Sequence, residues 1–135
     1  MNVVESFGLG VSYRGTWALR DCTLAVPEGH IVALVGSNGA GKTTLLHCVV
    51  GLTTQTAGEI TVLGGIEAGS PDALDRVAFV AQEAPLYRQI TVRAMLTVAA
   101  NLNQNFDRNL AETRLANLDI PLERRVGRLL SLIHI

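Results

Sequence analysis

Apolar runs and their interruptions divide the first part of the chain into extended segments. The pattern of residues 7–26 predicts extended structure, and from Cys22 to Val26 every second residue is suited to a half-buried strand face. Residues 27–29, Pro-Glu-Gly, predict a turn. Residues 30–35 are apolar, β-branched and short, which predicts a buried parallel strand after that turn.

Residues 44–81 alternate between helix and strand signals. Residues 44–50 contain no Gly or Pro and are followed by Gly51, which predicts a helix with a glycine stop. Residues 59–63 and 77–81 predict two further strands, the first of them ended by a pair of glycines. Ser70 is followed by a proline and an acidic residue, so it predicts the N-cap of a short helix.

The later part of the chain has a helical pattern. Thr91 and Asp107 each precede a segment with apolar residues on one helical face, so each predicts an N-cap. We therefore expect a sheet-containing portion over residues 1–88 and a helical portion over residues 89–129, with the boundary at residues 87–90.

Composition narrows the class of protein. The chain has 135 residues, enough for one modest domain, and its net charge of -1 does not favour nucleic acid or an acidic membrane as partner. The content is 48% hydrophobic and only 17% charged, which suggests that part of the surface is covered by a partner. The start of the chain lacks the basic segment of a signal peptide. Cys22 and Cys48 form no C-x-x-C pair, so free thiols in a reducing cytosol are expected.

One motif carries the chemistry. Residues 36–43 read Gly-Ser-Asn-Gly-Ala-Gly-Lys-Thr and match the phosphate-binding loop G-x-x-x-x-G-K-[ST], between a predicted strand and a predicted helix. Its glycines let the backbone approach a phosphate and turn N–H groups toward it, and the helix start adds positive potential. Lys42 supplies charge to the β- and γ-phosphates, and the Thr43 hydroxyl is placed to ligate Mg²⁺. The residues expected to bind the phosphates are Gly36, Ser37, Asn38, Gly39, Ala40, Gly41, Lys42, Thr43 and Thr44.

Further motifs follow in the order and at the spacing of one family, and the chain resembles the ATP-binding subunit of ABC transporters from about residue 13 to residue 129. These motifs lie at residues 57–64 (Ala-Gly-Glu-Ile-Thr-Val-Leu-Gly), 80–83 (Val-Ala-Gln-Glu, similar to the Q-loop), 86–87 and 91–93 (Leu-Tyr and Thr-Val-Arg, as in many exporter-type members) and 121–129 (similar to the lead-in to the signature sequence). The resemblance implies an α/β fold: a P-loop NTPase core of the ABC type with an antiparallel β subdomain and the start of the helical subdomain, incomplete.

The resemblance also implies roles for individual residues toward ATP and Mg²⁺. Tyr13 would stack on adenine, although an ordinary strand tyrosine is the alternative. Gln82, with Thr43, would hold Mg²⁺, although it could be a plain loop glutamine. The segment that begins at Glu83 and ends at Arg88 would face a membrane-spanning subunit, or would be plain surface. The full-length parent would pair head to tail with a second ATP-binding subunit, in the cytoplasm and peripheral to the membrane.

The chain departs from the family after Leu129. Where the family continues Ser-Gly-Gly-Gln, residues 130–135 read Leu-Ser-Leu-Ile-His-Ile, and the later strand with its acidic pair and the switch histidine have no counterpart. His134 cannot replace that histidine, His30 and His47 are expected to be structural, and no residue is assigned to catalysis. Residues 130–135 resemble a translated transposase-adapter sequence, with a native apolar C-terminal strand as the alternative.

Three functional hypotheses remain open at this point. The first is a fragment of an exporter-type ABC transporter ATPase that binds MgATP and is unable to hydrolyse it. The second is a small stand-alone P-loop kinase or nucleotide-binding module, with Arg124, Arg125 and Arg128 as the arginines of a lid. The third is an inactive adaptor with a vestigial phosphate loop.

Overall fold

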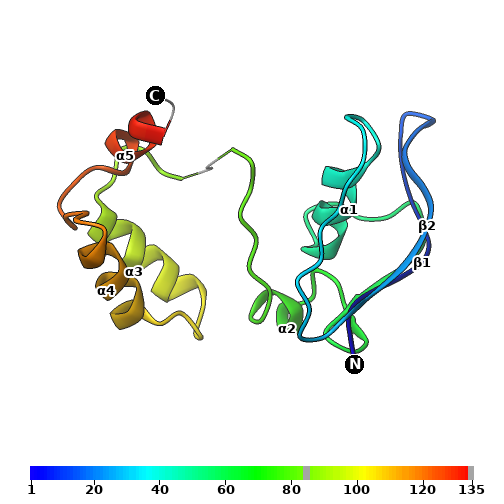
Figure 1. Ribbon diagram of the computed structural model, residues 1–135, viewed down its shortest axis with the longest axis horizontal. Helices are drawn as coiled ribbons and strands as arrows, with labels where there is room; N and C mark the ends of the chain where they lie inside the picture. The colour runs from blue at the N-terminus through cyan, green and yellow to red at the C-terminus, as the bar shows by residue number, and fades with distance from the viewer. Residues whose placement is uncertain (84–85, 134–135) are drawn as a thin grey trace. The chain divides into compact units, whose positions relative to one another are not determined.

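An antiparallel sheet of four strands, in the order β2-β1-β3-β4, carries the phosphate loop and its helix (Figure 1). The computed structural model describes residues 1–83 and 86–133, and the chain divides into two compact units, Met1–Ala78 and Phe79–Ile135. The strands of the first unit are β1 (Asn2–Tyr13), β2 (Thr16–Pro27), β3 (Ala57–Val62) and β4 (Ile66–Glu67). This sheet confirms the predicted extended structure of residues 7–26 and the strand at residues 59–63.

Strands β1 and β2 form a hairpin with a two-residue turn. Arg14 and Gly15 both have positive φ angles, 50° and 82°, which match the right-handed twist of the strands on either side of the turn. Tyr13 pairs with Thr16 across the turn. Further along the hairpin the pairing shifts at several bulges, which bend the strands and change the residues that face each other.

The core of the first unit lies between this sheet and helix α1 (Lys42–Val49). Leu9, Val11 and Ile60 from the sheet are at most 5% exposed, and Leu45 and Cys48 from α1 pack against them. Each fully buried aliphatic side chain contributes roughly 1.5–3 kcal/mol. The apolar residues of α1 therefore fix the helix, and with it the phosphate loop, onto the sheet.

Three helices begin at the N-cap residues that the sequence predicted. The short helix α2 (Pro71–Leu74) is capped by Ser70, α3 (Val92–Leu102) by Thr91 and α4 (Arg108–Asn117) by Asp107, each through a side-chain oxygen that accepts a backbone N–H. The chain ends in α5 (Val126–Ile133), so a C-terminal strand, the alternative considered for residues 130–135, does not form over the residues described. Among the described residues, no helix has the length and apolarity needed to cross a membrane.

Two predicted strands, residues 30–35 and residues 77–81, do not form. Both segments lack regular structure; Ile31 and Val35 are 105% and 88% exposed, and Val80 is 93% exposed. The apolar, β-branched composition is favourable for a strand, but a strand also needs a neighbour for its backbone N–H and C=O groups. The strands that the structure describes pair only among themselves, so neither segment has such a neighbour.

The two units divide after Ala78, before the boundary that the sequence suggested at residues 87–90. Backbone hydrogen bonds account for the earlier position. The carbonyl oxygen of Arg88 accepts from Gly127 N–H at 3.0 Å, and that of Ile90 accepts from Val126 N–H at 2.9 Å. These bonds attach the segment before α3 to the start of α5, and hence to the second unit.

Cys22 and Cys48 should differ strongly in reactivity. Cys48 is 1% exposed and its burial raises the pKa of the thiol, whereas Cys22 is half-buried on β2. Because the thiolate is the reactive form, we expect iodoacetamide at pH 8 to label Cys22 much faster than Cys48. Peptide mapping by mass spectrometry measures both rates, and equal rates would show that α1 opens readily from the sheet.

Candidate phosphate-binding site

The phosphate loop joins an irregular segment of the first unit to α1. Gly39 and Gly41 have φ angles of 83° and 95°, a left-handed conformation that residues with a side chain rarely adopt. Within the loop, Ala40 N–H donates to the carbonyl oxygen of Ser37 at 3.2 Å, which closes a tight turn. Residues 36–40 are exposed, so the inside of this turn is open to a ligand from solvent.

The start of α1 offers backbone donors at the end of this loop. Leu45 N–H makes a helical bond to the carbonyl oxygen of Gly41, at 2.9 Å. The N–H groups of the turn before it have no partner within a helix, and the N-cap, Gly41, has no side chain to cap them. Such a helix end attracts anions through these donors and through the helix dipole.

Lys42 folds back over the loop. Its Nζ donates to the carbonyl oxygens of Gly36 and Ser37, both at 2.6 Å. These bonds hold the ammonium group at the loop's own carbonyls and within reach of an anion bound there. The positive charge is thus already placed at the loop, and binding requires only that the ammonium exchange carbonyl partners for phosphate oxygens.

A close backbone contact fixes the loop to the sheet. A Cβ at Gly41 would lie 2.6 Å from the carbonyl oxygen of Ala18 and 3.1 Å from Cδ1 of Leu19, so only glycine fits against β2 here. Sequence reasoning explained this glycine by its approach to phosphate and missed its contact with β2. The motif gives no indication of which strand lies beside it.

Tyr13 lies at the end of β1, two residues after Val11, which packs in the core with Leu45 of α1. Its side chain is 54% exposed at the end of β1, close in sequence to the part of β2 that contacts the loop. Trp17 packs against Gly10, where a Cβ would come within 2.8 Å of the indole ring. The stacking role of Tyr13 stays a prediction.

The remaining predicted site residues are Thr43, which follows Lys42 directly, and Gln82 with the segment after it, which lie further along the chain. Thr43 is exposed in the first turn of α1, beside the loop. Gln82 is an exposed residue of the second unit, so its pairing with Thr43 stays a prediction. Of the segment from Glu83 to Arg88, the two residues at positions 84–85 lie outside the described residues.

The sequence is similar to those of known proteins. A family model described as ABC transporter matches residues 19–131. The chain is 43% identical over 91 residues to the cobalamin import ATP-binding protein BtuD of Halobacterium salinarum, an alignment that covers 66% of this chain and 23% of the relative. It is 34% identical over 133 residues to the sulfate/thiosulfate import ATP-binding protein CysA of Yersinia pseudotuberculosis, covering 98% and 34%.

The chain also resembles solved structures of ABC transporter ATP-binding proteins. The ATP-binding subunit of an ABC transporter superposes with a TM-score of 0.76 at 25% identity, over 91% of this chain and 54% of the other. A putative ABC transporter ATP-binding protein from Pyrococcus furiosus gives 0.72 at 26% identity, over 93% and 62%. The chain thus spans between about a quarter and a third of the length of these two curated relatives.

Proposed function

The chain belongs to the ABC transporter family, with the family's ATP-binding fold over residues 19–131, and from this premise we propose that it binds MgATP in the phosphate loop. Residues 36–44 would hold the phosphates and Tyr13 would stack on the adenine. The observation that carries the proposal is the position of the Lys42 ammonium at the loop, beside uncapped N–H groups at the start of α1.

The residues present also fit a magnesium ion that accompanies the nucleotide. The Thr43 hydroxyl is exposed next to the loop, and a hydroxyl is a suitable oxygen ligand for a hard cation that keeps most of its waters. The bound ion would neutralise part of the phosphate charge. Gln82 remains the proposed second protein ligand, from the second unit.

The direction of transport is revised from the sequence analysis. The exporter-type assignment rested on residues 86–87 and 91–93. It receives no support from the relatives, whose names describe import of cobalamin and of sulfate or thiosulfate. We propose an import system as the context. A membrane-spanning subunit, which would contact the segment from Glu83 to Arg88, and a second ATP-binding subunit are the proposed partners, at the cytoplasmic face of the membrane.

Hydrolysis is not proposed for these residues alone. None of the described residues at the loop is a carboxylate or histidine positioned as a base toward a phosphate, so the proposal is binding without turnover. A stand-alone kinase, with Arg124, Arg125 and Arg128 as the arginines of its lid, is disfavoured by the family match. An assay for phosphate release and for transfer to nucleoside monophosphates tests both statements, with no activity expected in either.

The test of the nucleotide site compares ATP with inorganic triphosphate. Tyr13→Ala should weaken ATP binding by roughly 1–3 kcal/mol, the range for a base stacked on an aromatic ring, and should leave triphosphate binding unchanged because triphosphate has no base. Tyr13→Phe keeps the ring and should bind ATP like the parent. Isothermal titration calorimetry measures all six affinities. An equal loss for both ligands would show that Tyr13 supports the loop instead of the base.

A further inference from the structure

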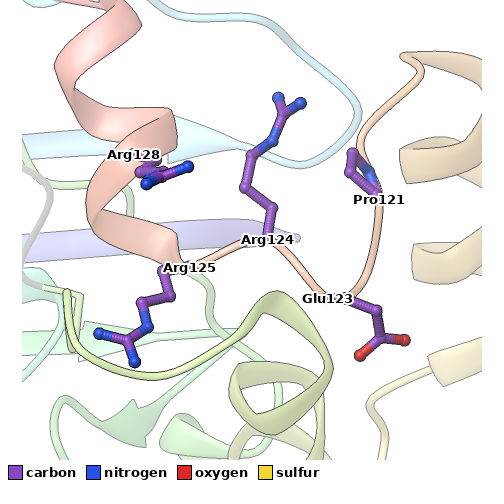
Figure 2. A pocket seen from close by; sticks show the side chains of 5 residues that line it. All are labelled: Pro121, Glu123, Arg124, Arg125 and Arg128. Atoms are coloured by element: carbon purple, nitrogen blue, oxygen red, sulfur yellow. The ribbon is translucent and has the colours of Figure 1, made fainter.

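The second unit contains a hollow of about 560 Å³ with a pronounced positive charge. Figure 2 shows its lining, and three of the five residues are arginines that project from one short stretch of chain at the start of α5. The lining residues are Pro121, Glu123, Arg124, Arg125 and Arg128. This size is within the range of small-molecule pockets, which hold about 300–1,000 Å³.

Hydrogen bonds to residues at the start of α3 hold the backbone that carries these arginines in place. The carbonyl oxygens of Leu122 and Arg124 accept from Arg93 N–H and Val92 N–H, both at 2.9 Å, and Arg125 forms an isolated β-bridge with Thr91. Below them, Val92 is 6% exposed and Val126 is 3% exposed, and the two pack together. The arginine side chains therefore extend from a fixed base, which lowers the entropy cost of arranging them around a ligand.

The single carboxylate of the hollow is already engaged. Glu123 Oε1 accepts from Arg93 Nε at 3.2 Å and from Arg93 Nη2, and this hydrogen bonding lowers the pKa of Glu123, so the carboxylate is ionised at neutral pH. Arg93 does not line the hollow. Among residues 1–83 and 86–133, no carboxylate forms an ion pair with Arg124 or Arg125.

We propose that this hollow binds a small soluble anion that carries two or more phosphate groups. Arg124, Arg125 and Arg128 place like charges around one hollow, and an anion bound in it offsets their mutual repulsion. The planar fork of arginine matches phosphate oxygens through paired hydrogen bonds, better than the point charge of a lysine. A single phosphate would leave much of the volume empty, whereas a chain of phosphates can contact several arginines at once.

The phosphate loop binds the same chemistry, so the test must separate the two sites. The full chain carrying Lys42→Ala serves as the background, because this change removes the loop's charge and leaves the second unit untouched. Phenylglyoxal modifies accessible arginines, and peptide mapping reports the rate at each one. With inorganic triphosphate at ten times its dissociation constant, the rates at Arg124 and Arg125 should fall about tenfold, following the unbound fraction.

Arg114, an exposed arginine of α4 in the same unit, should be modified at an unchanged rate. Unchanged rates at Arg124 and Arg125 would overturn the proposal. So would protection by phosphatidylglycerol vesicles without protection by triphosphate, because that result would assign the arginines to a lipid surface.

Substitutions give an independent measurement. In the same background, Arg124→Gln with Arg125→Gln should remove triphosphate binding in calorimetry. Arg114→Gln, which removes the same kind of charge from α4 of the same unit, should retain it. Retained binding in the double variant would contradict the proposal. If the double variant fails to fold, the phenylglyoxal modification rates of the chain that carries Lys42→Ala alone test the proposal.

Discussion

Replacing Lys42 by Ala should lower the affinity for MgATP by about 10²- to 10⁴-fold and change the stability of the free chain little. A hydrogen bond to a charged group is worth about 1.5–3 kcal/mol, and the ammonium can reach two phosphates, so the expected loss is about 3–6 kcal/mol. In the free protein Nζ bonds only to loop carbonyls that are exposed and can turn to water. The loop conformation depends instead on Gly39 and Gly41, which the variant keeps.

Calorimetry with MgATP and a thermal melt without nucleotide measure the two quantities separately. Arg76→Ala removes an exposed positive charge from the same unit and should bind MgATP like the parent. Similar affinities in Lys42→Ala and the parent would count against the phosphate loop as the nucleotide site. A large fall in melting temperature would instead show that the ammonium supports the loop structure.

Features that depend on neighbours in sequence were predictable. Ser70, Thr91 and Asp107 cap helices through bonds that reach only three residues ahead, so the local pattern contains all the needed information. The phosphate loop is local in the same way, since its glycines and its lysine act within eight residues. The helix after it begins at Lys42, two residues before the predicted start.

Features that depend on distant partners were predicted poorly. Residues 30–35 have the composition of a strand, but pairing depends on another segment being available, which composition does not report. The contact of Gly41 with Ala18, and the ion pair between Arg93 and Glu123, join residues far apart in the chain. No periodic pattern marks such contacts, so both the support of the loop and the position of the arginine hollow emerged only from the structure.

The unpaired segment at residues 31–35 leads to the last prediction, that this chain associates in solution at micromolar concentrations. Val32 and Leu34 line an apolar hollow of about 310 Å³ together with residues of the sheet and of α1, whereas Ile31 and Val35 are almost wholly exposed. An extended apolar segment with free backbone groups can pair with another chain. Burial of Ile31 and Val35 against a second copy would stabilise that pairing by roughly 1.5–3 kcal/mol for each side chain.

Ile31→Lys combined with Val35→Lys should restore a monomer in size-exclusion chromatography, because both side chains face solvent and like charges on the two copies oppose pairing in either strand direction. The melting temperature of the monomer should change little, since neither residue lines the apolar hollow. Leu102→Lys with Leu118→Lys is the matched control. Both leucines are exposed, at 80% and 70%, but they lie at the ends of helices of the second unit, so association should persist. A parent chain that elutes as a monomer at every concentration, or a control pair that dissociates it equally well, would show that residues 31–35 are not the associating surface.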